Sequence, residues 1–166
     1  ALTFEYRPNY TIDVVEDFDG VGLQFAATPG SDTNLLRTSD PNEMLVVPGM
    51  NNAKSGTFSL SPLTKGEFKS ITAFELPKGG ANVWLEVDYK TEVALTFGIY
   101  SNEPTQSLQT PVVTLFPNEE WNKVYLNLVT EVSGHPQAVN YNLFFGAINA
   151  TDSTAQVWLD NIKLLY

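Results

Sequence analysis

The sequence predicts an all-β chain in which two antiparallel sheets pack face to face, as in a sandwich or jelly roll. Hydrophobic residues make up 43% of the 166 residues, which is enough apolar side chain for one core. Apolar and polar residues alternate through the second half, whereas no long segment has a helical period. Gly, Pro, Asn and Ser clusters separate the apolar runs. We therefore expect residues 1–166 to form a single β-sandwich domain.

The first half contains five expected strands, which are shorter and less regular than those that follow. They cover residues 12–15, 21–26, 44–47, 56–60 and 68–76. Turn-forming residues lie between them. Because no helix is expected, each sheet can bury its apolar face only against the other sheet.

The clearest alternation begins at Val83, where apolar side chains at 83, 85, 87 and 89 alternate with Trp84, Glu86 and Asp88. After a short break at 90–92, residues 93–99 repeat the pattern. Two consecutive strands with a tight connection predict a β-hairpin. Residues 101–111 are polar and end in proline, which favours a loop.

Three further strands are expected at 112–116, 121–128 and 141–148, with turns at 117–120 and 133–136. The last strand covers 155–166. Its apolar residues Val157 and Leu159 share one face, whereas Ile162 and Leu164 fall on the opposite phase. This change of phase predicts a β-bulge at Asp160-Asn161.

The charge distribution argues against nucleic acid as a partner. The formal net charge is −10, and the nine Lys and Arg residues are scattered singly, whereas a nucleic-acid binder concentrates basic residues on one surface. The chain has no cysteine, which excludes disulfides, thiolate metal sites and thiol nucleophiles. No transmembrane segment is expected, because no apolar stretch approaches the length of a membrane span.

Three short motifs resemble those of galactose-binding-like and carbohydrate-binding-module jelly rolls. The ending from Val157 to Leu164, with its Leu159-Asp160-Asn161-Ile162 core, is similar to their closing strand. The segment 15–20 resembles their opening, and the segment 121–126 resembles a Trp-x-x-aromatic strand. The overall style is similar to that of surface lipoproteins from Bacteroidetes. The resemblance implies an extracytoplasmic location, at the bacterial cell surface or in the periplasm, and a lipid anchor upstream of Ala1.

The resemblance also implies a structural calcium that joins the first strand region to the last strand. Its ligands would be Asp160 and the acidic residues of the opening segment, Glu16, Asp17 and Asp19. Calcium is a hard cation that prefers such oxygen ligands. The alternative is a solvated acidic turn and a bulge aspartate that accepts hydrogen bonds from backbone amides. Apart from this calcium, no cofactor is expected.

Exposed aromatic residues are the candidates for binding a polysaccharide or oligosaccharide, because their faces can stack on pyranose rings while amides and carboxylates bind the hydroxyls. The candidates on the polar phase of the strands are Trp84 with Glu86 and Asp88, Tyr100, Trp121 with Tyr125, and Trp158. The alternative is that these rings pack beneath loops.

Catalysis is not expected. Glu86-Val87-Asp88 is similar to the acidic strand of laminarinase-like glycosidases, which makes a glycoside hydrolase using Glu86 and Asp88 a remote alternative. The third acidic position of that motif is missing, and the only histidine, His135, lies in a Gly-His-Pro turn. Two interpretations remain: a noncatalytic carbohydrate-binding module, and a structural or protein-interaction jelly roll without a glycan site. The sequence does not indicate the oligomeric state.

Overall fold

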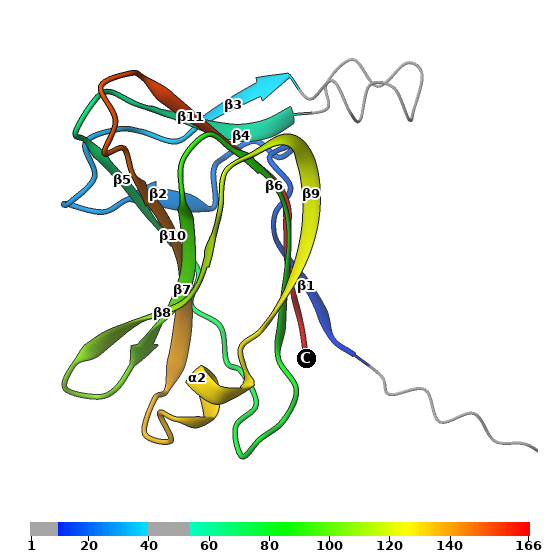
Figure 1. The fold of residues 1–166 in the computed structure, drawn as a ribbon. Helices are drawn as coiled ribbons and strands as arrows, with labels where there is room; N and C mark the ends of the chain where they lie inside the picture. Colours follow the sequence, from blue (N-terminus) through cyan, green and yellow to red (C-terminus); the bar gives the residue numbers. More distant parts are fainter. Residues whose placement is uncertain (1–9, 40–53) are drawn as a thin grey trace, which may run out of the picture.

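The computed structural model describes residues 10–39 and 54–166, which form two antiparallel sheets that face each other (Figure 1). The expected all-β, two-sheet antiparallel sandwich of the jelly-roll type is confirmed. The expected strand at 44–47 lies outside the described residues. The only helix in the described part of the chain is the short α2 (Val129–Ser133), which was not expected and lies at one end of the sandwich. None of the described helices is long and apolar enough to cross a membrane.

The first sheet, called sheet A, is built around the last strand of the chain. Its order is β3 (Leu36–Ser39), β4 (Lys54–Leu60), β11 (Ala155–Leu165), β6 (Trp84–Thr91) and β9 (Asn118–Asn127). The opening strand β1 (Ile12–Glu16) also belongs to it. β4 pairs with the first half of β11, and β1 pairs with the second half.

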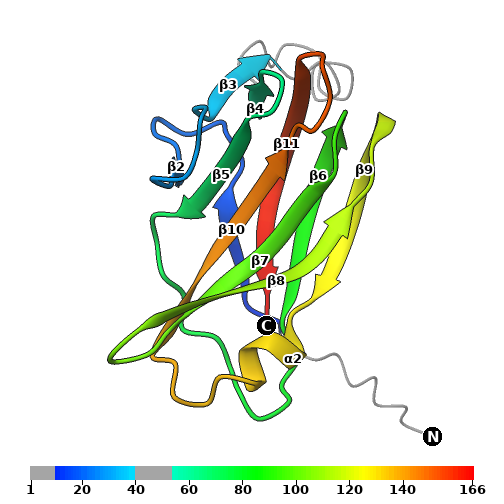
Figure 2. The ribbon, with the colours of Figure 1, turned by 60° about the vertical axis from the view of Figure 1, so that its left-hand side comes forward.

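The second sheet, called sheet B, has the order β2 (Phe25–Ala27), β5 (Lys65–Ser70), β10 (Asn140–Ile148), β7 (Leu95–Asn102) and β8 (Ser107–Leu115). Figure 2 shows its strands running side by side in front of sheet A. Each sheet therefore has one face toward the other sheet and one face toward solvent.

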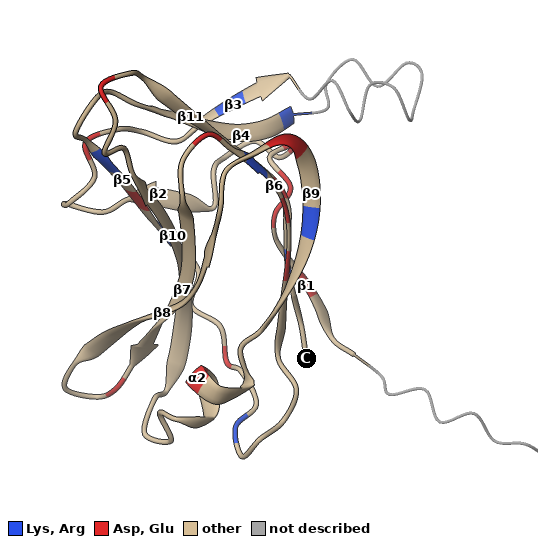
Figure 3. Cartoon of the chain, in the orientation of Figure 1, with Lys and Arg blue, Asp and Glu red and all other residues tan. Residues whose placement is uncertain are grey.

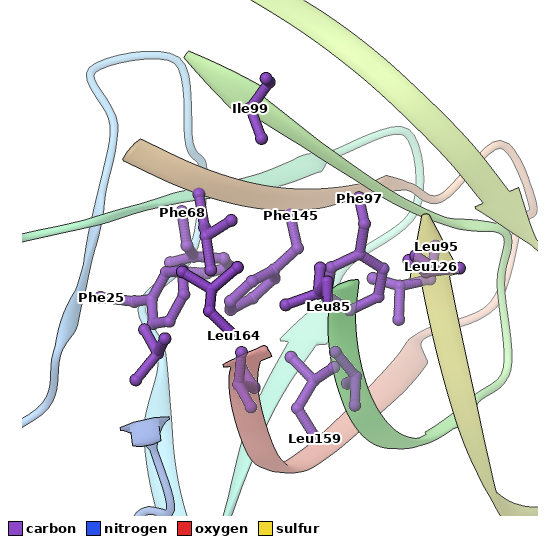
Figure 4. Packing of buried hydrophobic residues seen from close by; sticks show 14 of the residues in the cluster. Phe25, Phe68, Leu85, Leu95, Phe97, Ile99, Leu126, Phe145, Leu159 and Leu164 are labelled. Atoms are coloured by element: carbon purple, nitrogen blue, oxygen red, sulfur yellow. The ribbon is translucent and has the colours of Figure 1, made fainter. Parts of the chain in front are cut away.

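The core between the sheets is formed by the apolar phase of the strands. Leu85, Phe97 and Leu126 are 1%, 2% and 7% exposed, as the period-two pattern predicts. Phe145 lies at the centre (Figure 4), with ring centroids 4.9 Å from Phe25 and 5.8 Å from Phe97. Two further rings surround Phe145: the Phe68 ring of sheet B, with its centroid 5.3 Å from that of Phe145, and the Phe58 ring of sheet A, at 6.1 Å. The aromatic cluster thus joins the two layers.

The expected hairpin at 83–99 is wrong, because β6 belongs to sheet A and β7 to sheet B. The chain crosses between the layers at Thr91–Val93. The buried Thr91 hydroxyl donates to the Val93 carbonyl at 2.5 Å, and the Glu92 amide donates to the Gln156 carbonyl at 3.0 Å. These bonds stabilise the crossing. The sequence did not predict it, because the alternation of apolar and polar residues continues unchanged when a strand passes to the other sheet.

The expected loop at 101–111 is also wrong, because β7 continues to Asn102 and β8 begins at Ser107. Glu103 and Gln106 exchange backbone hydrogen bonds of 2.8 and 3.4 Å, which closes a true hairpin. β8 lies at the edge of sheet B, where a polar composition and a proline are tolerated. Pro111 lies at a register shift opposite Gly98.

Other strand limits differ by smaller amounts. The turn expected at 117–120 is largely strand, because β9 begins at Asn118. The sequence did not predict β3. The bulge in β11 is confirmed: the register against β6 shifts between Asp160 and Lys163, and Asn161 has a φ of 49°. Val157 and Leu159 before the bulge are both 0% exposed, and so is Leu164 after it.

Candidate functional site

The candidate ligand-binding residues are divided between the outer faces of the two sheets. Trp84, Glu86 and Asp88 lie along β6 in sheet A, and Tyr125 on the adjacent β9 pairs with Glu86. Tyr100 lies on β7, in sheet B. The structure therefore brings most of these residues onto one face but separates Tyr100 from them.

Trp121 and Trp158 come together near the end of the same outer face of sheet A. Trp121 on β9 and Trp158 on β11 line a common small cavity with Lys90 of β6. The Lys90 ammonium lies 4.8 Å from the centroid of the Trp158 ring, a cation–π contact. Trp84 is at the opposite end of β6, opposite Asn127, so the three indoles do not form one platform.

The two carboxylates of β6 are held by a network of polar side chains. Glu86 accepts a hydrogen bond from Tyr125 at 2.7 Å and from Lys123 at 3.2 Å, and Lys163 lies 3.7 Å away. Asp88 accepts a hydrogen bond from the Asn161 side-chain amide at 2.9 Å. Both carboxylates are therefore engaged within the sheet.

The network keeps Glu86 ionised. Burial alone would raise the pKa of Glu86, but hydrogen bonds from Tyr125 and Lys123 and the charges of Lys123 and Lys163 outweigh burial and bring that pKa below its ordinary value. A glycosidase acid needs the opposite shift, because it must carry a proton near neutral pH. The pKa of Glu86 therefore does not favour Glu86 as the acid of a glycoside hydrolase, although an ionised carboxylate is compatible with the nucleophile role.

The acidic residues of the opening segment bind backbone amides. The buried Glu16 carboxylate accepts from the amides of Phe18, at 2.8 Å, and Gln24. Asp17 accepts from the Asp19 amide at 3.0 Å, and Asp19 from the Lys54 amide at 2.6 Å. These bonds fix the turn at which Phe18 adopts a φ of 61°.

The fit of this segment to calcium is incomplete. Asp160 is 1% exposed and accepts a hydrogen bond from the Asn161 amide at 2.8 Å. Among residues 10–39 and 54–166, no three Asp, Glu, His or Cys side chains come close enough to hold a metal ion. The structural calcium at Glu16, Asp17, Asp19 and Asp160 therefore stays a prediction.

The outer face of sheet B has a groove that the sequence did not reveal. It crosses β5, β10, β7 and β8 and has a volume of 360 Å³. Its lining includes Lys65, Glu67, Thr96, Gln109, Pro111, Phe144 and Gly146. We call this the sheet B groove.

Glycines make room for the groove and for an aromatic ring beside it. Gly146 lies between Glu67 and Thr96 in the cross-strand register and leaves a hollow there because it has no side chain. A Cβ at Gly98 would lie 2.4 Å from the Phe144 ring. Phe144 therefore lies against the sheet, only 4% exposed although it is on the outer face.

Tyr100 extends the aromatic surface at one end of the groove. Its ring meets Phe144 edge-on, with centroids 5.4 Å apart and an interplanar angle of 67°. The Lys69 ammonium lies 4.5 Å from the Tyr100 centroid, and Gln109 is opposite Tyr100 on β8. Burial raises the pKa of Tyr100, and the negative charge of Glu67 adds to that effect, so the phenol stays protonated and able to donate.

Side-chain amides continue the polar surface beyond Tyr100. Asn102 donates to Asn140 at 2.8 Å and to Asn142 at 2.7 Å, while Ser107 donates to Asn102 at 2.7 Å. At the other end, Glu67 accepts from the Thr28 hydroxyl at 2.7 Å. Charged, amide, hydroxyl and aromatic groups are thus distributed along one face of sheet B.

Charged residues are otherwise dispersed over the molecule. Figure 3 shows Lys and Arg as isolated positions on different strands, with acidic residues between them. The described residues therefore form no concentrated basic surface of the kind that binds nucleic acid.

Comparisons with solved structures show the fold. Matches include the family 11 carbohydrate-binding module of cellulase Lic26A-Cel5E from Clostridium thermocellum, at 16% identity and TM-score 0.57, which covers 93% of this chain and 94% of that chain. A family 29 carbohydrate-binding module matches at 12% identity and TM-score 0.56, covering 96% and 90%. No family model matches the chain, and no curated protein matches it significantly.

A longer protein also contains a similar fold. The enzymatically active domain of tailspike protein 4 from bacteriophage CBA120 matches at 14% identity and TM-score 0.64 over 90% of this chain. The match spans only 20% of that tailspike chain. The chain therefore has a jelly-roll fold like that of carbohydrate-binding modules, as its motifs predicted; its resemblance to Bacteroidetes lipoproteins stays a prediction.

Proposed function

We propose that this chain is a noncatalytic carbohydrate-binding module that holds a glycan in the sheet B groove. The observation that carries the proposal is the combination of a 360 Å³ groove with mixed polar and aromatic walls. The volume lies within the range of small-molecule sites, about 300–1,000 Å³. Several neighbours in fold are carbohydrate-binding modules, which supports the same assignment.

The chemistry of the groove suits a neutral sugar chain. Glu67 and the Gln109 amide oxygen can accept hydrogen bonds from sugar hydroxyls, while Lys65 and the Gln109 NH₂ group can donate to them. The Tyr100 ring, supported by Phe144, provides an apolar surface for a pyranose ring when the Lys69 side chain, which lies over the Tyr100 ring at 4.5 Å, moves aside. Because Gly146 has no side chain, a sugar can closely approach the protein backbone at the floor of the groove.

Binding without catalysis is part of the proposal. The sheet B groove contains one carboxylate, Glu67, on its lining, whereas glycoside hydrolysis normally uses a pair. The paired carboxylates Glu86 and Asp88 are on the other sheet, engaged with Tyr125, Lys123 and Asn161. The whole tailspike protein has an enzymatically active domain, but its activity is not carried over here because the match spans a small part of it.

The location follows as a proposal from the same function. A module that binds polysaccharide meets its ligand outside the cytoplasm, so we place the protein at the bacterial cell surface or in the periplasm. The lipid anchor upstream of Ala1 remains part of this proposal.

A glycan array tests the proposal. The array should present plant, host and microbial polysaccharides, with the β-1,3-1,4-mixed-linked tetrasaccharide and cellohexaose included because family 11 and family 29 modules were solved with these ligands. We expect saturable binding to at least one neutral glycan. No binding to any glycan on the array would favour a structural or protein-interaction domain.

A further inference from the structure

We propose a second sugar site on sheet A, in the cavity between Trp121 and Trp158, that binds the uronate unit of an acidic polysaccharide. The cavity has a volume of 210 Å³ and is lined by Thr38, Ser39, Ser55, Lys90, Trp121 and Trp158. We call it the indole cavity. It lies on the opposite sheet from the sheet B groove, so it does not depend on whether that groove binds a glycan.

The lining has the composition expected of a site for an acidic sugar. It combines two indoles with three hydroxyl-bearing residues and one ammonium, and it includes no carboxylate. This is unusual in a chain with net charge −10. Indole faces bind the apolar faces of pyranose rings, and hydroxyls bind the ring substituents. Lys90 supplies the positive charge that a sugar carboxylate needs.

Lys90 is available for such a partner. Its ammonium lies over the Trp158 ring at 4.8 Å from the centroid. None of the carboxylates in the described part of the chain forms an ion pair with it, whereas Lys123 and Lys163 on the same face both contact Glu86. A cation between an indole and a cavity can bind an anion without first breaking an ion pair to any of the described carboxylates.

A second, independent observation comes from Ser55. Its side chain lines the indole cavity, the residue is 1% exposed, and its hydroxyl has no hydrogen-bond partner among the described residues. Buried hydroxyls nearly always have a partner. Thr57, the next residue on the same face of β4, is satisfied: its hydroxyl donates to the Val157 carbonyl at 2.9 Å. The Ser55 hydroxyl is therefore available to bind a ligand in the cavity.

An adjoining cavity indicates how the sugar chain continues. It has a volume of 640 Å³, shares Lys90 and Trp158 with the indole cavity, and is also lined by Glu92, Asn118 and Glu119. The Asn118 side-chain oxygen is buried there without a partner. Two carboxylates and an amide oxygen accept hydrogen bonds from neutral hydroxyls but repel a second uronate. The geometry thus fits a uronate linked to a neutral sugar, rather than a homopolymer of uronates.

The three tryptophans provide the assay. In a ¹⁵N-labelled chain, the indole N–H signals of Trp84, Trp121 and Trp158 can be assigned by single Trp→Phe variants and followed during titration with sodium glucuronate. We expect the Trp121 and Trp158 signals to shift saturably while Trp84 stays still, since Trp84 lies at the other end of β6. Glucose at equal ionic strength should bind at least tenfold more weakly.

Two variants test the assigned contacts. Lys90→Met should weaken glucuronate binding at least tenfold, and Ser55→Ala should weaken it severalfold, with unchanged dispersion of the remaining amide signals as evidence that both variants fold. Tyr100→Ala, which alters the sheet B groove, should leave the glucuronate response intact and so separates the two sites. No saturable shift at Trp121 and Trp158, equal responses to glucose and glucuronate, or an unaffected Lys90→Met variant would overturn the second site.

Discussion

Gly98→Ala tests the link between the backbone of sheet B and the shape of its groove. The added Cβ would lie 2.3 Å from the Thr110 carbonyl oxygen and 2.4 Å from a carbon of the Phe144 ring. The Phe144 ring can swing outward, but the contact with the Thr110 carbonyl can be relieved only by a backbone shift that strains the pairing of β8 with β7. Overpacking of this kind costs about 1–3 kcal/mol, and loss of the edge contact with Tyr100 costs a further 0.5–1.5 kcal/mol, roughly.

The net effect should be smaller than the sum, because alanine loses less backbone entropy than glycine on folding, by about 0.5–1 kcal/mol. We expect Gly98→Ala to lower the free energy of unfolding by about 1–3 kcal/mol in urea titrations. The displaced Phe144 ring should also narrow the sheet B groove and weaken glycan binding at least tenfold, equivalent to about 1.4 kcal/mol.

Two glycines serve as controls. Gly22 has no atom within 4 Å of an added Cβ, so Gly22→Ala should change the free energy of unfolding by less than about 0.5 kcal/mol. Gly56→Ala places a Cβ 2.3 Å from the Phe18 ring in the core, so it should destabilise the protein but retain glycan binding. The reasoning is refuted if Gly98→Ala unfolds at the same urea concentration as Gly22→Ala.

Three further predictions concern charge. The hydrogen bond to Asp13 and burial raise the pKa of Tyr166 from 10.0 to about 12. The stability that the protonated phenol adds is therefore complete below pH 10 and is lost as the pH rises toward 12. In urea titrations, Tyr166→Phe should reduce this loss of unfolding free energy with pH, and the same pH dependence in the variant would count against the prediction. The lowered pKa of Glu86 adds stability that is present above its ordinary pKa of 4.5 and is lost as the pH falls. Glu86→Ala should lower the free energy of unfolding by about 1 kcal/mol at neutral pH, because Lys123 and Lys163 each lose a contact with this carboxylate while Lys123 keeps Asp88 at 3.4 Å. No change in the free energy of unfolding would contradict the network. If a structural calcium joins Asp160 to the opening segment, the native chain should melt at a higher temperature in calcium than in EDTA, whereas Asp160→Asn should melt at the same temperature in both. Equal melting temperatures of the native chain in calcium and in EDTA would count against the calcium site.

Much of the fold could be predicted from the sequence because burial in a sandwich follows a period of two. That pattern identified the inner faces of β6, β7, β9 and β11, and the phase change in β11 located the bulge at Asp160-Asn161. It could not identify which sheet a strand joins. Thr91 to Val93 resembles a tight hairpin in composition, yet the chain changes layer there.

The candidate sites were harder to predict, because a site requires residues from several strands. Alternation placed Trp84, Glu86, Tyr125 and Tyr100 on the polar phase of their strands. It could not predict that the first three share the outer face of sheet A while Tyr100 lies on sheet B, because this depends on the strand order. The sheet B groove depends on Gly146, where a side chain is absent, and a glycine in a strand is a weak signal for a groove. The glycine at 98 gave the same weak signal.

The most direct test of the account compares two matched tyrosine variants, one on each outer face. Tyr100→Ala removes the ring that continues the sheet B groove beyond Phe144, whereas Tyr125→Ala removes an exposed tyrosine from sheet A. Each variant should be titrated calorimetrically with the neutral glycan that binds most strongly on the array. We expect Tyr100→Ala to weaken binding at least tenfold, about 1.4 kcal/mol, and Tyr125→Ala to bind like the native chain. Undiminished binding by Tyr100→Ala, or a loss confined to Tyr125→Ala, would contradict this expectation.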